Sequence, residues 1–226
     1  YTFYDARAFN QDIGTWQTGA VTTMYYTFAF AYDFNQDLSA WSIGAVTTMQ
    51  GMFYSASAFN QQLCWSIAAS VNIDYMFYSN PGSVDGCQPS PAPTATPLPT
   101  LTLRPTFGLS APFTFTSKAD LKTATDAWVS DVSAAQMAYG HISTWDTSLI
   151  TDMSFLFCGA ASASSNNYEC DEAYQSFNDD VGAWQTGAVT TMKGMFYDAN
   201  AFNQDIGAWQ TGAVTDMSYT FRDATA

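Results

Sequence analysis

Large apolar residues recur along most of the chain at intervals of 25 residues, in one group near the start and another near the end. One unit reads F-N-Q-D-(I/L)-x-x-W-x-x-G-A-V-T-T-M-x-x-(M/T)-F-x-x-A-x-A. A degenerate unit with slightly shortened spacing follows at residues 63–77. The columns that keep this interval are Phe9, Phe34, Phe59, Phe177 and Phe202; Trp16, Trp41, Trp184 and Trp209; and Met24, Met49, Met192 and Met217. A single unit cannot bury such residues, but stacked neighbours can, so the pattern predicts a tandem array with one continuous core.

The polar and β-branched positions of each unit predict its local structure. The segment A-V-T-T-M favours a short parallel strand, at 21–24, 46–49, 189–192 and 214–217, and M-x-x-M-F-x-x-A has the spacing of a helical turn. We expect the tryptophans to stack in the core. The asparagine of F-N-Q-D is expected to form a ladder that bonds to orphaned backbone groups, at Asn10, Asn35, Asn60, Asn178 and Asn203.

The merged motif F-N-Q-D-I-G-x-W-x-T-G-A-V-T-x-M-x-x-M-F resembles the bacterial and protist surface-protein repeat of about 26 residues, a relative of the BspA-like leucine-rich repeats. The resemblance covers residues 1 to 80 and 113 to 226, approximately. It implies a repeat solenoid of leucine-rich-repeat type, an α/β fold of short parallel strands with helical turns, on a secreted or surface protein. It implies no activity, because the family has no shared catalytic residues.

A segment rich in Pro, Thr and Ser at 88–112 interrupts the array and divides the chain into three parts. Residues 1–87 are expected to be the C-terminal half of a solenoid with its end cap. Residues 113–226 are expected to hold the N-terminal cap helix, starting near Ser117, and the first turns of a second solenoid. The fold expected is therefore two half-solenoids joined by a Pro-rich linker, which favours extended polyproline II structure.

The linker also resembles hydroxyproline and O-glycan attachment modules of plant and algal walls, although an unmodified spacer fits the same composition. The candidate positions are Pro89, Ser90, Pro91, Pro93, Thr94, Thr96, Pro97, Pro99 and Thr100. The four cysteines allow three pairings. Local pairing, Cys64 with Cys87 and Cys158 with Cys170, needs no contact between the two halves, and it indicates an oxidising, extracellular setting.

The net charge limits the classes of ligand and partner that the chain is expected to bind. Twenty acidic residues against six basic ones give −14, which repels nucleic acid and anionic membranes. An acidic column at Asp12, Asp37 and Asp205 is an ordinary solvated face or a Ca²⁺ site; no other cofactor is implied. The second Ca²⁺ candidate is the cluster Glu169, Asp171, Glu172, Asp179 and Asp180. No apolar run is long enough to span a membrane. With one histidine and no nucleophile or nucleotide motif, an enzyme is not expected.

The two ends of the chain are related. The segment YTFRDATA at 219–226 matches YTFYDARA at 1–8, and joining them would order the units as Trp145, Trp184, Trp209, Trp16, Trp41 and Trp65. Without a cap, Phe3 at one end and Met217 and Phe221 at the other would face water. We therefore expect the last unit to stack on a first unit, belonging either to another copy or to an adjacent module of one long chain.

Two classes of function fit these observations. The first is a structural extracellular or cell-surface protein, which builds a fibre or wall layer by end-to-end stacking. The alternative is an adhesin-type module that recognises glycan or protein through a face of the repeats, using exposed tyrosines and the threonine column Thr22, Thr47, Thr190 and Thr215.

Overall fold

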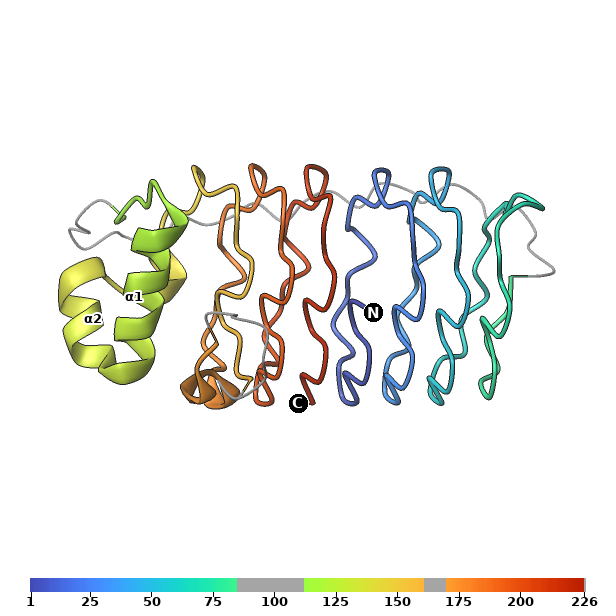
Figure 1. The fold of residues 1–226 in the computed structure, drawn as a ribbon, viewed down its shortest axis with the longest axis horizontal. Helices are drawn as coiled ribbons and strands as arrows, with labels where there is room; N and C mark the ends of the chain where they lie inside the picture. The colour runs from blue at the N-terminus through green and yellow to red at the C-terminus, as the bar shows by residue number, and fades with distance from the viewer. Residues whose placement is uncertain (85–111, 161–169, 226) are drawn as a thin grey trace, which may run out of the picture.

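The computed structural model describes residues 1–84, 112–160 and 170–225. These residues form one stack of coils, one coil per 25-residue unit, closed at one end by two helices (Figure 1). Backbone N–H groups of each coil donate to carbonyl groups of the next, as Phe3 does to Thr27 (2.8 Å) and Phe28 to Met52 (2.7 Å). Neighbouring coils thus satisfy backbone groups that one irregular coil leaves unpaired.

The expectation of a leucine-rich-repeat-like α/β solenoid is wrong. The described residues contain two α-helices, α1 (Lys118–Ser130) and α2 (Val132–Tyr139), two 3-10 helices, η1 (Ile142–Thr144) and η2 (Glu172–Ser176), and no strand. The V-T-T-M segments pair only through isolated parallel bridges, for example Thr23 with Thr48. Neighbouring segments share a single bridging pair before the chain turns away, so no ladder grows into a sheet.

The expected helical turn of M-x-x-M-F-x-x-A is also absent from the coils. Tyr26 and Phe30 have φ values of 48° and 61°, in the left-handed region, and an α-helix cannot continue through such residues. N–H groups instead alternate between two partners: Thr27 donates back to Met24 (3.3 Å), and Phe28 donates across to the next coil. A series of tight turns therefore has the apolar spacing that sequence alone assigns to a helix.

The tryptophan column is confirmed, and it fixes the order of the coils. Each indole is buried and donates from Nε1 to a carbonyl oxygen of the preceding coil. The bonds are Trp184 to Ile142 (2.9 Å), Trp209 to Val181 (3.2 Å), Trp16 to Ile206 (3.4 Å), Trp41 to Ile13 (2.9 Å) and Trp65 to Leu38 (3.2 Å). The coils that begin the chain thus follow those that end it.

The two parts of the chain do not form separate half-solenoids with open ends. Phe221 donates its N–H to the carbonyl of Thr2 (2.8 Å), and Asp223 donates to Tyr4 (3.1 Å). Phe3 and Phe221 are each 1% exposed. The ends do stack as expected, but the partner is the same chain rather than another copy; in Figure 1 the red C-terminal coils lie beside the blue N-terminal ones.

Helices α1 and α2 cover the end of the stack nearest Trp145 (Figure 1). The side chain of Ser117 caps α1 by accepting from the N–H of Asp120 (3.1 Å). Leu121, Ala124 and Trp128 form the buried face of α1, and the indole of Trp128 donates to the Asp179 carboxylate (2.9 Å). This helix shields the apolar end of the core from water, as its sequence predicts.

Candidate functional site

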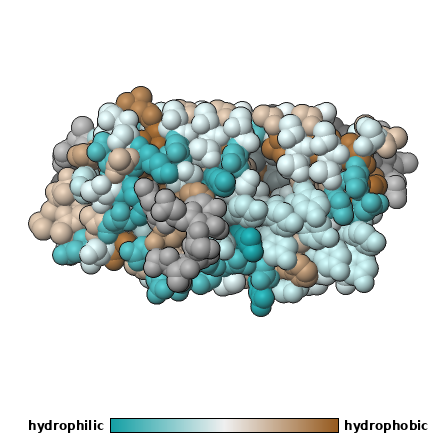
Figure 2. All heavy atoms as spheres, viewed as in Figure 1, coloured by the Kyte–Doolittle hydropathy of each residue, from teal (hydrophilic) through white to brown (hydrophobic). Residues whose placement is uncertain are grey.

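Five tyrosines form a continuous row across the junction between the two parts of the chain, which we call the tyrosine row: Tyr219, Tyr1, Tyr26, Tyr54 and Tyr78. Successive ring centroids lie 5.9, 6.0, 5.9 and 4.8 Å apart, with near-parallel planes in three of the four pairs. Mildly polar side chains gather over the lower part of the coils of residues 1–84 (Figure 2). Rings stacked at this spacing cover one another's faces and present their apolar C–H edges and their phenol groups to solvent.

Local backbone geometry aims these rings. Tyr26 and Tyr219 of the row, and Tyr75 in the groove beside it, all have positive φ. The next coil has Gly51 at the corresponding place, and a β-carbon there would lie 2.7 Å from the Tyr26 ring. The repeat thus presents a ring where one coil has tyrosine and leaves room for it where the next has glycine.

The tyrosine row borders an open groove of about 500 Å³, lined by Tyr4, Tyr26, Phe30, Tyr54, Tyr75 and Tyr78. The two tyrosines at its outer end, Tyr75 and Tyr78, are 62% and 52% exposed. Burial raises the pKa of Tyr26, and burial together with Tyr25 raises the pKa of the Tyr1 phenol to about 12. Both phenols are uncharged at neutral pH, as an ordinary tyrosine is, and that of Tyr1 is already hydrogen-bonded to Tyr25.

Arginine and aspartate side chains line the border of this surface. The Arg222 guanidinium lies over the rings of Tyr4 (5.6 Å) and Tyr219 (5.5 Å). Burial raises the pKa of Asp198 and of Asp223, and the charge of a neighbouring aspartate raises each pKa further. The charge of Arg222 lowers the pKa of both. The arginine thus supports the rings and compensates two half-buried carboxylates.

The six aspartates among the Ca²⁺ candidates make local structural contacts. Asp12, Asp37 and Asp205 each accept the N–H of the residue two positions on, at 2.8–2.9 Å. In the predicted cluster, Asp171 caps η2, Asp180 bonds to Gly182 and Asp179 binds Trp128, while Glu172 lies exposed in η2 and Glu169 lies outside the described residues. No group of three or more acidic, His or Cys side chains is placed to hold a metal within residues 1–84, 112–160 and 170–225.

The asparagine ladder is confirmed, and three of the four threonines of the column bond to a neighbouring coil. Asn10 accepts the N–H of Asn35 (2.9 Å), which accepts that of Asn60 (2.9 Å), and Gln side chains bond to the same asparagines. Thr47, Thr190 and Thr215 donate their hydroxyls to the preceding coil (2.9–3.1 Å). The exposed threonines thus join coils together, which leaves the tyrosines as the better candidate contacts.

Cys158 and Cys170, one of the two expected pairs, form a disulfide with Cα atoms 4.7 Å apart. Cys64 is also a disulfide cysteine, whereas its expected partner, Cys87, lies outside the described residues. The nine candidate O-glycan and hydroxyproline positions between Pro89 and Thr100 lie outside them too. No helix in the described part of the chain has the length and apolar character needed to cross a bilayer.

A family described as "Mycoplasma protein of unknown function, DUF285" matches residues 1–84 and 124–226, which include the coils of both parts of the chain. The chain belongs to the DUF285 family. No curated protein and no solved structure matches it. Family membership accounts for the repeat in both parts of the chain and assigns neither a ligand nor an activity.

The site contains features that sequence alone did not reveal. Exposed tyrosines were expected as contacts, but not as one row that crosses from Tyr219 to Tyr1. The similarity between segments 1–8 and 219–226 was the feature of the sequence that could have predicted this continuous row. Nothing in the sequence indicated the left-handed backbone conformation of Tyr26, because tyrosine rarely adopts positive φ.

Proposed function

We propose that this chain is an extracellular binding module of adhesin type, which recognises neutral glycans through the groove beside the tyrosine row. The observation that carries the proposal is the uninterrupted stacking of five tyrosines along the coils. Sugar rings have apolar C–H patches and hydroxyl groups, which match the C–H edges of the stacked rings and their phenol groups respectively. The resemblance to BspA-like surface repeats supports the same setting.

Charge and rigidity favour a neutral glycan over other ligands. A net charge of −14 opposes acidic polymers at long range, while the phenols are uncharged. Tyrosine has few rotatable bonds, and here each ring is already stacked on a neighbour, so little conformational entropy is lost on binding. The Cys158–Cys170 disulfide agrees with an oxidising environment.

The test is titration calorimetry against a panel of neutral and acidic oligosaccharides. Tyr54→Ala and Tyr78→Ala should each weaken binding of a neutral oligosaccharide roughly three- to tenfold. Tyr32→Ala is the matched control, because Tyr32 is 38% exposed and does not line the groove. Absence of oligosaccharide binding, or equal losses in all three variants, contradicts the proposal.

End-to-end stacking into a fibre is the second candidate, favoured by the end of the stack opposite α1. Ile73, Tyr75 and Tyr78 are 44%, 62% and 52% exposed there, on the last described coil. Such an apolar end can receive another stack. Light scattering over a wide concentration range tests it: growth that Tyr75→Ser abolishes supports the fibre, and a mass independent of concentration contradicts it.

A further inference from the structure

The groove beside the tyrosine row follows four consecutive coils of the stack, those that contain Phe3, Phe28, Phe53 and Phe77. In that order the coils contribute Tyr4, then Tyr26 and Phe30, then Tyr54, and finally Tyr75 and Tyr78. Successive rings of the phenylalanine column lie 4.8, 5.5 and 5.6 Å apart. The groove therefore runs along the axis of the stack and repeats in steps of that size.

These four coils are stacked almost without twist or bend. The planes of successive phenylalanines in the column differ by only 5°, 4° and 3°. Figure 1 likewise shows the coils side by side along a straight line. A straight ligand that repeats at about the coil spacing would therefore meet equivalent contacts on every coil.

Each of the four coils supplies an aromatic ring and a phenol group to the groove. The rings of Tyr4, Phe30, Tyr54 and Tyr78 follow one another along it, with centroids 5.5, 5.6 and 4.8 Å apart. Phe30 has no hydroxyl, and Tyr26 supplies the phenol of that coil. Within the described parts of the chain, no charged side chain lines the groove, so it suits a neutral ligand.

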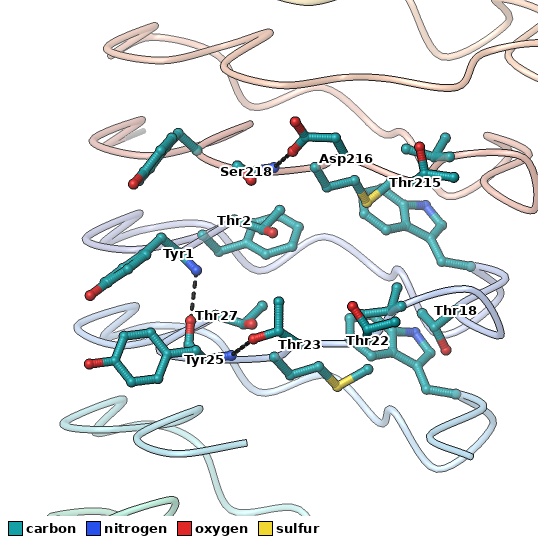
Figure 3. Close-up of a pocket in the computed structure, with 18 residues that line it drawn as sticks. Tyr1, Thr2, Thr18, Thr22, Thr23, Tyr25, Thr27, Thr215, Asp216 and Ser218 are labelled. Carbon is teal, nitrogen blue, oxygen red and sulfur yellow. Dashed lines mark hydrogen bonds between the residues drawn. The ribbon is translucent and has the colours of Figure 1, made fainter. Parts of the chain in front are cut away.

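Contacts at one end and along one side hold the groove in shape. The Arg222 guanidinium, from the coil that precedes the groove, lies over the ring of Tyr4 (5.6 Å). The Tyr1 ring packs edge to face against Tyr25 (5.2 Å), and Figure 3 shows both rings on the same side of adjacent coils. Both also pack against Tyr26, with centroids at 6.0 and 4.7 Å. The lining rings are thus fixed by neighbours before any ligand binds.

We propose that the groove binds a straight, neutral, β-1,4-linked polysaccharide laid along the stack, with one sugar on each of the four coils. The inference rests on the glycan-binding function proposed above and names the class of glycan. A β-1,4 linkage gives an extended chain whose sugars advance by about the coil spacing, whereas an α-1,4 linkage curves the chain. On each coil, C–H patches of a sugar contact the edge of an aromatic ring, and its hydroxyl groups bond to a phenol.

The dependence of affinity on chain length tests this inference. The whole chain is titrated in a calorimeter with two β-1,4-linked series, cello-oligosaccharides and manno-oligosaccharides, each from one to six sugars long. For the series that binds, affinity should rise roughly threefold with each sugar up to four, and change little beyond four. Malto-oligosaccharides of the same lengths, which are α-1,4-linked and curved, should gain nothing beyond two sugars.

Tyr78→Ala connects the length of the ligand to the coils. Tyr78 lies on the last of the four coils and is 52% exposed, so the fold does not depend on its ring. In this variant affinity should level off at three sugars: the trisaccharide binds as before, and the tetrasaccharide loses roughly threefold. Tyr32→Ala, outside the groove lining, should still level off at four.

The outcomes separate this inference from the function on which it rests. Binding that does not strengthen beyond two sugars overturns the inference and leaves glycan binding standing. The same holds for equal affinity of β-1,4-linked and α-1,4-linked chains of matched length, and for a Tyr78→Ala variant whose affinity still rises up to four sugars. Absence of binding by every oligosaccharide overturns both.

Discussion

The rings of Phe3 and Phe221, from opposite ends of the chain, stack with centroids 4.9 Å apart and planes 2° apart. The same arrangement joins Phe3 to Phe28 and Phe28 to Phe53 inside the stack. The junction between the two ends is therefore built like any interior step between coils. Its stability should be comparable with theirs.

Phe221→Ala tests that equivalence. We expect it to lower the free energy of unfolding by about 3–5 kcal/mol, the usual cost of removing a buried phenylalanine ring. Phe28→Ala, at an interior step, should cost about the same, because both rings are fully buried between phenylalanines. Urea unfolding measures both; a negligible effect at Phe221 alongside a large one at Phe28 would show that the ends do not pack together.

Gly51→Ala should destabilise the stack by more than about 1 kcal/mol. Gly51 has a φ of 60°, and a β-carbon there would lie 2.7 Å from the Tyr26 ring. Gly44→Ala is the matched control, because nothing lies within 4 Å of its β-carbon position. That change should be neutral or slightly stabilising. Thermal unfolding of the two variants side by side separates local geometry from a general effect of removing glycine.

Asn35→Ala should lower stability by about 1–3 kcal/mol, because it leaves the N–H of Asn60 without its acceptor at 2.9 Å and the Gln61 amide without one of its acceptors. Asn200→Ala serves as control, since Asn200 is exposed and its side chain accepts only one long bond, from Thr225 at 3.5 Å. Equal midpoints of chemical unfolding for the two variants would argue against the ladder.

In a polypeptide made to begin at Tyr1, stability should rise with pH between about 5 and 8 through the Tyr1 amine. Its pKa falls from 8.0 to about 5 on folding, so in this window the unfolded chain binds a proton that the folded chain does not. This stabilisation is complete above about pH 8 and lost as pH falls to about 5. Unfolding of the chain beginning at Tyr1, compared with its N-acetylated form, isolates the effect. A pH dependence that acetylation leaves intact would assign it to other groups.

Sequence predicted the columns of the stack well and its backbone poorly. Spacing along the chain directly reports which residues share a column, so Trp16, Trp41 and Asn35 were placed correctly. Strands were predicted because V-T-T-M is β-branched, but composition does not report how many pairs form before the chain turns. The helical turn was predicted from apolar spacing, which the turns at Tyr26 and Phe30 also satisfy.

The partner of the chain ends could not be predicted for a different reason. In a tandem repeat every coil presents nearly the same face, so Phe221 can stack on Phe3 of the same chain or of another with the same contacts. Only the path between the two parts of the chain decides which occurs. The crossing of the tyrosine row from Tyr219 to Tyr1 follows from that closure, so sequence did not reveal it.

The central claim is that one chain closes its own stack through the step between Phe3 and Phe221. A protease site introduced between Pro99 and Thr100 allows the two parts to be separated after folding, and size-exclusion chromatography with light scattering then reports whether they stay together. The account predicts an uncut chain of 24.6 kDa that remains one particle of that mass after cleavage. It also predicts that Phe221→Asp releases the two pieces. Pieces that separate after cleavage without that substitution, or an uncut chain that is a dimer, would contradict it.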